Sequence, residues 1–393
     1  MSNKTPYRFL WVFVMAGVLF TSCRQGANTH SQAEKKACAK LSSLNLKYAR
    51  GFTVDYYDGF KVITIRDCND TARLLAQYVL MPAGKPMPVG FENGVAVATP
   101  VRKIACISTT HIAQMAKLGL TDSIAAVTNL DLINDAEVVE KVKRHLIEDI
   151  GSQEIDYEKL AALAPSFIIT SGSFDGGDKM SVKLDALHIK QVTGLEYKEQ
   201  EPLARAEWLL FIAAFYNREG LAEKEFDTIA QNYLQLKAKA AAAATKPTVF
   251  CNLPFKEIWY MPCGENYIAR LIADAGGDFL WKDAKATNGL NLNLNYESVY
   301  NKAANADCWL VDASFIYSLS DLKKADAKNT FFKAYKTGQV YNYNNRETPA
   351  GGFDFWESGT VNPDKILADL IKIFHPGLLP GYQLYYYRRV NAK

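Results

Sequence analysis

The chain has 393 residues, and 45 lysines and arginines against 42 aspartates and glutamates leave a formal charge of +3. This balance gives no electrostatic reason to expect a nucleic-acid partner. Aromatic residues are numerous, with 21 tyrosines, 20 phenylalanines and 6 tryptophans, enough to line an amphipathic cleft as well as to fill cores.

The N-terminal segment predicts export. Lys4 and Arg8 precede an uncharged apolar run over residues 9–20, and small residues follow it up to Cys23. The run is too short to cross a hydrocarbon core of about 30 Å as a helix. Its basic, apolar and small parts have the layout of a secretory signal peptide, which we place at residues 1–22.

The letters LFTSC around Cys23 resemble a bacterial lipobox, although Phe20 stands where an aliphatic residue is usual. The resemblance implies that Cys23 becomes the lipidated first residue of the mature protein. The polar stretch that follows predicts a flexible tether over residues 23–45. No later segment of the sequence is long and apolar enough to span a bilayer.

About 350 residues remain beyond the tether, more than one core usually grows to, so we expect two lobes. Residues 46–100 contain short alternating segments around an Asp58-Gly59 turn, which predict a β-hairpin with an added strand. From Lys103 strand-like runs alternate with helical patterns. This alternation indicates a parallel sheet flanked by helices in an N-terminal lobe, residues 46–220.

A second series of the same kind predicts a C-terminal lobe over residues 246–393. Between the two series, residues 221–245 are rich in alanine and place Phe226, Ile229 and Tyr233 at helical spacing, which predicts one long linker helix. The predicted fold is therefore α/β: two Rossmann-like lobes joined by a single long helix, with an added N-terminal β-hairpin.

The cysteines after Cys23 divide by their surroundings. Cys106, Cys251 and Cys308 sit inside apolar strand-like runs, which favours small buried hydrophobes. Cys38 and Cys68 have polar neighbours. An exported chain can pair such residues, but their connectivity stays open from sequence alone.

Residues 101–376 resemble the periplasmic solute-binding proteins of ABC importers for iron siderophores, haem and cobalamin, the class with two lobes joined by one long helix. The matching segments are VRKIACISTTHIAQMAKLGLTDSIAAVTN, IDYEKLAALAPSFIITSG, NYIARLIADAGGDFLW and YESVYNKAANADCWLVDA. The C-terminal stretch from Val340 to Pro376 also resembles lipoproteins of the Bacteroidota. The resemblance implies a ligand held between the lobes, at the carboxyl ends of the strands.

On that resemblance, the candidate ligand contacts are residues of the loops after the strands. They are Ser108, Thr109, His111, Asn129, Ser171, Ser173, Phe174, Trp259, Tyr260, Asn266, Phe315, Arg346, Phe353 and Trp356.

These residue types suit a bulky metal chelate, because aromatic faces supply apolar contact and Arg346 can pair bidentately with a carboxylate. A siderophore, haem and cobalamin stay open: Arg346 favours the first, His111 the second as an axial ligand, and the aromatic density the third. We expect the ligand to bring its own iron or cobalt. No cofactor and no metal site of the protein are expected, since the histidines are scattered over different elements.

The resemblance further implies an ABC permease and ATPase as partners, met through one acidic residue on each lobe. Glu158 matches the first position, whereas Arg270 stands at the second, so Glu265 and Glu297 are candidate substitutes. We expect a monomer held to a membrane by its lipid, at the periplasmic face or the outer-membrane surface. Two alternatives stay open, a surface lipoprotein that captures ligand without permease docking and a hydrolase. The sequence has no Walker, HExxH, G-x-S-x-G or G-x-G-x-x-G motif in the required context.

Overall fold

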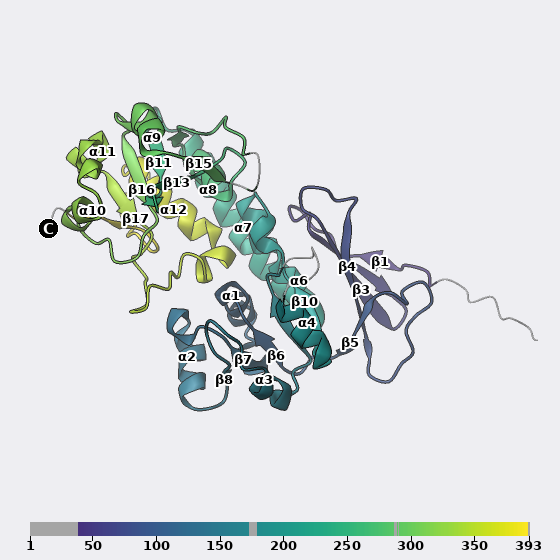
Figure 1. The fold of residues 1–393 in the computed structure, drawn as a ribbon. Helices are drawn as coiled ribbons and strands as arrows, with labels where there is room; N and C mark the ends of the chain where they lie inside the picture. Colours follow the sequence, from purple (N-terminus) through teal and green to yellow (C-terminus); the bar gives the residue numbers. More distant parts are fainter. Residues whose placement is uncertain (1–37, 173–178, 287–288, 290, 392–393) are drawn as a thin grey trace, which may run out of the picture. The chain divides into compact units, whose positions relative to one another are not determined.

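The computed structural model of the protein describes residues 38–172, 179–286, 289 and 291–391. An N-terminal sheet precedes two α/β lobes, and the long helix α7 (Glu219–Ala241) lies between the lobes in the chain (Figure 1). The expected signal peptide and Cys23 lie outside the described residues. Within the described part of the chain, no helix is both long and apolar enough to cross a membrane.

The N-terminal sheet has the order β1-β2-β3-β4-β5. Its strands are β1 (Ser42–Ser43), β2 (Phe52–Tyr57), β3 (Phe60–Arg66), β4 (Leu74–Pro82) and β5 (Val95–Thr99). The predicted hairpin is confirmed as β2 and β3, which pair antiparallel around Gly59. It belongs to a larger sheet than expected, because β1 pairs with β2 and β5 joins β4 in parallel. The stretch expected to be tether, residues 23–45, therefore includes the first strand.

One face of this sheet packs on the first lobe. Phe52, Val54 and Ile63 share a core with α6 (Leu209–Phe215). The chain just before β2 is held by two buried carboxylates. Glu207 accepts the backbone N–H groups of residues 47–49 at 2.6 to 2.7 Å, and Glu199 accepts those of residues 50 and 51. The sheet is thus fastened to the segment around α5 (Pro202–Glu207).

The first lobe, the N-lobe, contains a parallel sheet in the order β10-β9-β6-β7-β8. Its strands are β6 (Ile104–Cys106), β7 (Ile124–Val127), β8 (Glu148–Asp149), β9 (Phe167–Thr170) and β10 (Gln191–Thr193). Its helices are α1 (Thr109–Lys117), α2 (Ala136–Lys143), α3 (Tyr157–Leu163), α4 (Lys179–Ala186), α5 and α6, with 3-10 turns η1 (Thr121–Ser123), η2 (Leu130–Leu132) and η3 (Glu196–Lys198). The central strands are buried on both faces, so they read as continuous apolar runs.

Helix α7 begins two residues before the predicted linker helix and ends at Ala241. Phe226, Ile229 and Tyr233 are buried as their spacing predicts. The helix packs on α6 of the N-lobe and on α12 (Pro363–Phe374) of the second lobe. It therefore joins the two lobes as a single rod.

The second lobe, the C-lobe, contains a sheet in the order β14-β11-β16-β17-β18, in which only the β17–β18 pair is antiparallel among the described strands. Its strands are β11 (Thr248–Cys251), β14 (Asp278–Phe279), β16 (Cys308–Val311), β17 (Val340–Asn342) and β18 (Arg388–Arg389). A smaller sheet joins β12 (Pro254–Phe255), β13 (Ile258–Pro262) and β15 (Asn291–Leu294). The helices are α8 (Tyr267–Asp274), α9 (Tyr296–Ala303), α10 (Leu319–Ala325), α11 (Lys333–Lys336) and α12, with η4 (Ala327–Phe331) and η5 (Ser358–Val361).

The two lobes repeat one local pattern. Asp156 accepts a backbone N–H at the start of α3, and Asn295 does the same at the start of α9. Each helix is followed by a buried strand, β9 or β16. Cys106, Cys251 and Cys308 are buried in strands as expected, and the thiols of Cys38 and Cys68 are free. The predicted α/β fold with two lobes and one long helix is confirmed.

Candidate functional site

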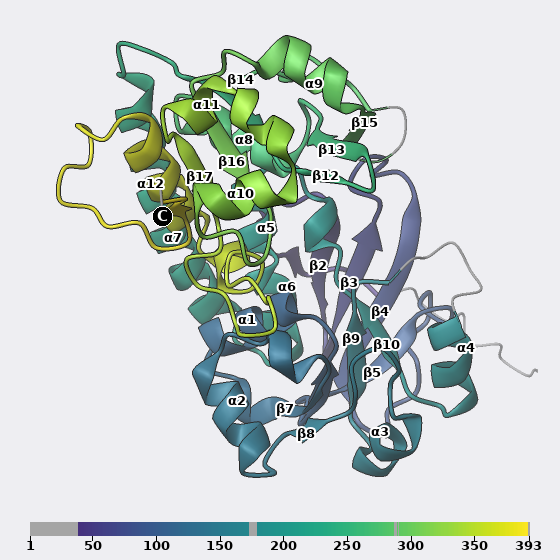
Figure 2. The same ribbon diagram turned by 60° about the vertical axis from the view of Figure 1, so that its left-hand side comes forward.

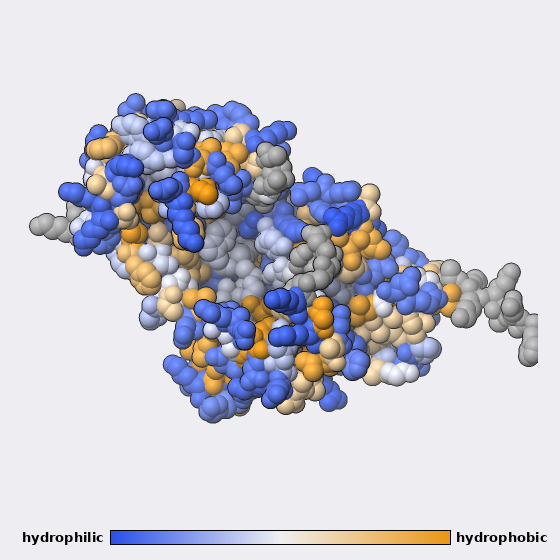
Figure 3. Space-filling model, in the orientation of Figure 1, coloured by the Kyte–Doolittle hydropathy of each residue, from blue (hydrophilic) through white to orange (hydrophobic). Residues whose placement is uncertain are grey.

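A cavity of about 160 Å³ opens at the carboxyl ends of the C-lobe strands. It is lined by Cys251 and Asn252 at the end of β11, by Leu310 and Asp312 around the end of β16, and by Tyr343 after β17. In the space-filling view the molecule is hollowed between the two lobes (Figure 3). The cavity is thus at the edge of the sheet where open α/β folds bind ligands.

Aromatic rings form much of this cavity. Tyr267, Tyr343, Trp356 and Tyr387 line it, and the Trp356 indole N–H donates to the Tyr343 hydroxyl at 3.2 Å. The ring of Phe355 stacks on the ring of Tyr343, with their centroids 4.3 Å apart, and so holds the tyrosine ring in place. The lining is therefore rigid and amphipathic, as ligand pockets usually are.

Polar groups reach the same cavity at a few points. Asn252, Asn266 and Asn291 line it together with Asp312. Burial raises the pKa of Asp312, and a hydrogen bond from Tyr343 acts in the opposite direction. Burial likewise raises the pKa of Tyr343 well above its ordinary value, so its hydroxyl stays protonated and serves as a donor.

Arg205 also lines this cavity, and the sequence interpretation did not include it. It stands on α5 with its guanidinium 4.0 Å above the ring of Tyr267. Its signal in the sequence is a charge inside the apolar run PLARAEWLLFIAAF, because a charged residue in a buried helix needs a reason to be there. Tyr267 and Tyr343 were missed because nothing in their local pattern separates a cavity wall from a core.

Three expected contacts from the C-lobe do reach this region. Asn266 caps α8 and lines the cavity, as does Trp356. Phe353 lies edge-on to Tyr343, with ring centroids 5.2 Å apart. The structure thus brings Asn266, Phe353 and Trp356 together.

Trp259, Tyr260 and Phe315 do not join them. Trp259 is fully buried in the C-lobe core and its indole N–H donates to the carbonyl of Cys251 at 2.8 Å. The expectation that Trp259 contacts ligand is therefore wrong. Tyr260 follows it in β13, points to the opposite face and is 38% exposed. Phe315 is 56% exposed in a left-handed loop position. Neither lines the cavity.

Arg346 is placed apart from Trp356. Its side chain forms an ion pair with Asp354, and its guanidinium lies 4.7 Å from the ring of Tyr385. It lines a different cavity of about 340 Å³, which Asn134 and Glu357 also line. Arg346, which was expected to pair with a carboxylate of the ligand, does not line the aromatic cavity, and its Nε pairs with Asp354.

The expected N-lobe residues lie at the carboxyl ends of its strands. Ser108 caps α1 by accepting the N–H of Thr110, and Thr109 opens that helix. Asn129 follows β7 in a left-handed conformation, φ 53°, and Ser171 follows β9. All four residues are at the predicted edge, and the side chains of Ser108 and Asn129 bond to groups of their own loops. Ser173 and Phe174 lie outside the described residues.

His111, an expected ligand contact, does not face the cleft. Its side chain is fully buried under Gly194, where an added Cβ would lie 2.7 Å from Nε2. Nε2 is 3.5 Å from the carboxylate of Glu196. Burial by itself would raise the pKa of Glu196, but His111, a backbone hydrogen bond and Thr110 together outweigh it, and the pKa of Glu196 is lowered. His111 therefore lies buried beside Glu196 and not at the cleft surface.

A C-lobe segment, residues 346–357, reaches across to the N-lobe; we call it the clasp. In Figure 2 the yellow-green chain between β17 and α12 descends to the level of α1. Glu357 accepts the N–H groups of Asn134 and Asp135 at 2.7 and 2.8 Å. Thr348 donates to the carbonyl of Asp131 at 2.7 Å. The clasp therefore ties the loop after β7 to the C-lobe.

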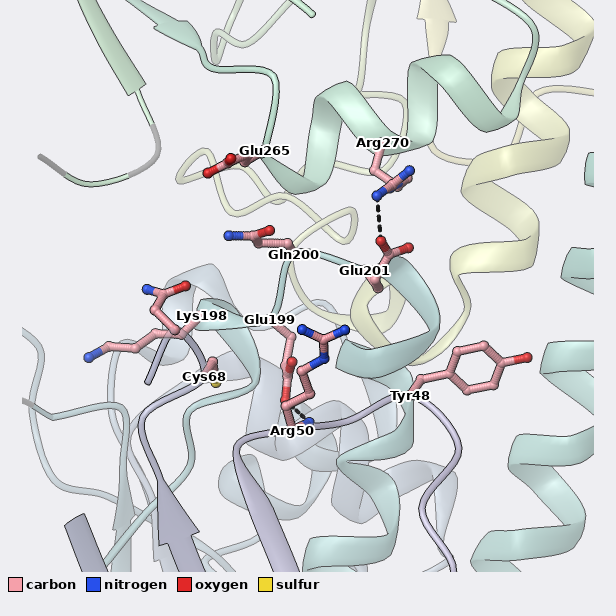
Figure 4. A pocket seen from close by; sticks show the side chains of 10 residues that line it. Tyr48, Arg50, Cys68, Lys198, Glu199, Gln200, Glu201, Glu265 and Arg270 are labelled. Carbon is pink, nitrogen blue, oxygen red and sulfur yellow. Dashed lines mark hydrogen bonds and ion pairs between the residues drawn. The ribbon is translucent and has the colours of Figure 1, made fainter. Parts of the chain in front are cut away.

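A larger and strongly charged pocket of about 380 Å³ lies elsewhere, where the N-terminal sheet, the segment before α5 and α8 meet (Figure 4). Arg50 and Lys198 stand on one side, and Arg270 pairs with Glu201 at 2.6 Å on the other. Because its lining is charged and exposed, it suits the chelate-type ligand less well than the aromatic cavity.

The two acidic residues expected to meet a permease are both exposed. Glu158 is in the first turn of α3, and Glu297 is in the first turn of α9. Arg270 is engaged by Glu201. Among the residues that the structure describes, no three or more His, Cys, Asp or Glu side chains gather where they could hold a metal ion.

Comparisons with known proteins agree on one family. A family model described as periplasmic binding protein matches residues 104–347. An uncharacterized lipoprotein of Methanocaldococcus jannaschii is 26% identical over 371 residues, covering 88% of this chain and 86% of the relative. A second uncharacterized lipoprotein of that organism is 24% identical over 401 residues, covering 97% of this chain and 98% of the relative.

Solved structures share the fold at low identity. A possible iron-binding, periplasmic solute-binding protein of Staphylococcus epidermidis matches with a TM-score of 0.55 and 16% identity, covering 70% of this chain and 99% of that one. IsdE of Staphylococcus aureus, complexed with haem, matches with a TM-score of 0.52 and 19% identity, covering 70% of this chain and 98% of that one. A protein of an Fe³⁺-hydroxamate transport system from Saccharomonospora viridis matches with a TM-score of 0.54 and 14% identity. The match covers 70% of this chain and 94% of that one.

Proposed function

Because the chain belongs to the periplasmic binding protein family, and so is a solute-binding protein of ABC transporters and not an enzyme, we propose that it captures an iron complex or cobalamin between its lobes. The iron complex is a siderophore or haem. The observation that carries the proposal is the cavity at the ends of β11 and β16, where Tyr343 and Trp356 form an aromatic wall. Planar or chelated ligands pack on such walls.

The names of the structural neighbours support this ligand class. One is called iron-binding, one was solved with haem, and one belongs to a hydroxamate transport system. The ligand brings its own iron or cobalt, so the protein needs only to surround it. Aromatic faces and a few polar groups suffice for that task.

We place the protein on a membrane through a lipid on Cys23, as a monomer. The N-terminal layout and the LFTSC sequence support the anchor, and two relatives are named lipoproteins. The anchor lies at the periplasmic face or at the outer-membrane surface.

Delivery to an inner-membrane permease runs through Glu158 and Glu297. Both are exposed at the starts of helices that repeat the same local pattern, so each lobe presents one carboxylate in an equivalent position. Arg270 has no part in this contact, because Glu201 already pairs with it.

Calorimetry of the full-length protein in detergent tests the proposal. Haem, cyanocobalamin and ferric complexes of hydroxamate and citrate are titrated in turn, and we expect one class to bind at a single site. The same titrations with Trp356→Ala report whether binding uses the aromatic cavity. Absence of binding with every ligand would remove the proposal.

A further inference from the structure

Arg205 carries a buried positive charge at the boundary of the two lobes. Arg205 is 8% exposed. It stands on α5, which lies in the chain between the last strand of the N-lobe sheet and α7. Burying an ionised side chain is costly unless hydrogen bonds or an opposite charge compensate it. The hydrogen-bond and charge partners of this guanidinium therefore indicate which ligand group the cavity can bind.

Two of its nitrogens are satisfied by neutral groups. Nε donates to the carbonyl of Glu199 at 2.9 Å, and Nη2 donates to the carbonyl of Tyr197 at 2.8 Å. The face of the guanidinium lies on Tyr267. These contacts fix the plane of the group, because an arginine fork held at two points has little freedom left.

No ion pair compensates the charge within the part of the chain that the structure describes. The Glu199 carboxylate accepts the N–H groups of Arg50 and Gly51 and the indole N–H of Trp208. The carboxylate of Glu196 is taken up by His111 and Thr110. The nearest acids thus have other partners. Burial lowers the pKa of Arg205, and the fields of Tyr267, Glu196 and Glu199 oppose this shift only in part.

The third nitrogen, Nη1, has no hydrogen-bond partner among the described residues, and Arg205 lines the cavity beside Trp356. A guanidinium held at two points that lines a cavity is a strong site for a charge-assisted hydrogen bond. Asp312 lines the same cavity. The buried carboxyl group of Asp312 disfavours a doubly charged ligand group in this cavity, so a ligand carboxylate fits better than a phosphate.

We propose that Arg205 holds a carboxylate of the transported ligand, inserted as a side arm into this cavity. At about 160 Å³ the cavity is smaller than the roughly 300–1,000 Å³ of pockets that hold a whole drug-sized ligand, so it accommodates an arm and not a whole chelate. The inference rests on the proposed function and narrows its ligand to complexes that carry a free carboxylate. It gives to Arg205 the role that the sequence suggested for Arg346.

Matched ligand pairs test the inference on the full-length protein in detergent. The pairs are haem and its dimethyl ester, cobyric acid and cobinamide, in which the one free carboxylate is amidated, and a ferric trihydroxamate with and without one free carboxylate. We expect the wild type to bind the carboxylate member of its preferred pair at least about tenfold more tightly. Arg205→Gln should remove this preference while leaving the affinity for the neutral member within about threefold.

Two further variants separate ligand binding from folding. Arg205→Lys keeps the charge but loses the fixed fork, so we expect an intermediate preference. Arg270→Gln removes an exposed arginine outside the cavity and should leave the preference unchanged. Thermal melting of each variant reports folding, and if Arg205→Gln does not fold, the wild-type preference and Arg205→Lys decide the result.

The outcomes are distinct. Equal affinity of the wild type for both members of the pair that it binds overturns the role of Arg205 and leaves the transport function in place. An unchanged preference in a folded Arg205→Gln protein also overturns it. Failure of every ligand to bind overturns the proposed function, and this inference with it.

Discussion

At the scale of single residues, buried carboxylates organise chain segments that form no regular structure. Glu207 gathers the backbone N–H groups of residues 47–49, and Asp369 gathers those of residues 385–387 at 2.7 to 2.8 Å. Burial raises the pKa of Asp369 to about 6, although these bonds act against the shift. Such groups replace a turn or a strand as the means of fixing the backbone.

Trp356 and Arg346 are expected to differ in their effect on ligand binding. Trp356→Ala removes an aromatic wall of the cavity and should weaken binding about 10- to 100-fold. Arg346→Gln should change the affinity less than about threefold, because Asp354 pairs with the arginine in another cavity. Titration of both variants checks this, with Phe315→Ala as an exposed aromatic control. A loss in Arg346→Gln as large as in Trp356→Ala would contradict the placement.

The sequence indicated these residue types better than their orientations. Trp259 and Tyr260 are adjacent aromatics in β13, and alternation sends one into the core and the other to the surface. Two aromatics in a row do not say which one points inward. The Arg346–Asp354 pair joins residues of one irregular loop, and no periodicity predicts such a contact. Charged residues inside an apolar run, as at Arg205 and Glu207, are a signal that sequence reading can use.

At the scale of elements, the β12–β13 hairpin turns through two residues in the left-handed region. Lys256 has φ 48° and Glu257 has φ 68°. Residues with a Cβ pay for this conformation with about 1–2 kcal/mol each, and Asn-Gly is the preferred pair in such turns. The hairpin therefore stores strain beside the exposed Phe255 and Ile258.

Replacing this turn by Asn-Gly should stabilise the protein. We expect the double variant Lys256→Asn, Glu257→Gly to raise the free energy of unfolding by about 1–2 kcal/mol, because the strain is relieved. Denaturant unfolding measures the change. Glu223→Gly, at an exposed position inside α7, is the matched control and should lower stability by about 1 kcal/mol. A loss of stability in the double variant would show that the turn is not strained.

Elements were predicted well where local pattern and burial agree. The apolar spacing of Phe226, Ile229 and Tyr233 places α7 within a few residues of its true ends. The extent of the N-terminal sheet was underestimated, because β1 spans only Ser42–Ser43 and β5 joins by a long-range parallel pairing. Neither feature leaves a period that a short window can detect.

At the scale of the whole molecule, the clasp couples the lobes through a titratable group. Glu357 is buried against the N-lobe, and burial raises its pKa to about 7 from an ordinary 4.5. When the lobes separate, water returns and the pKa falls back. The docked form therefore binds the proton more tightly, so docking is strongest below about pH 4.5 and weakens as the pH rises through about 7.

We expect the lobes to open more readily at pH 8 than at pH 5. The difference is at most about 3 kcal/mol, from a shift of about 2.5 pKa units. Distances between spin labels on the two lobes measure the opening. Glu357→Gln should flatten the pH dependence, whereas Glu158→Gln, an exposed carboxylate, should keep it. Identical distance distributions at both pH values would exclude this coupling.

Docking on the permease is expected to need both exposed carboxylates. Glu158→Lys and Glu297→Lys should each lower ligand-dependent stimulation of the importer ATPase by about tenfold or more, because a positive charge then replaces the carboxylate that is expected to meet a basic surface of the permease. Ligand affinity should stay the same, since neither residue lines the cavity. Glu223→Lys serves as the charge-reversal control. Full stimulation by the double variant would assign docking to other residues.

The fastening of the N-terminal sheet has a practical consequence for any shortened form of the protein. The family match begins at Ile104, which invites a chain cut at that point. Such a cut removes the N–H partners of Glu199 and Glu207, and these residues flank Arg205 on the same short segment. Two buried acids would then compete for Arg205, which lines the cavity, and affinities measured on the fragment would misrepresent the intact protein.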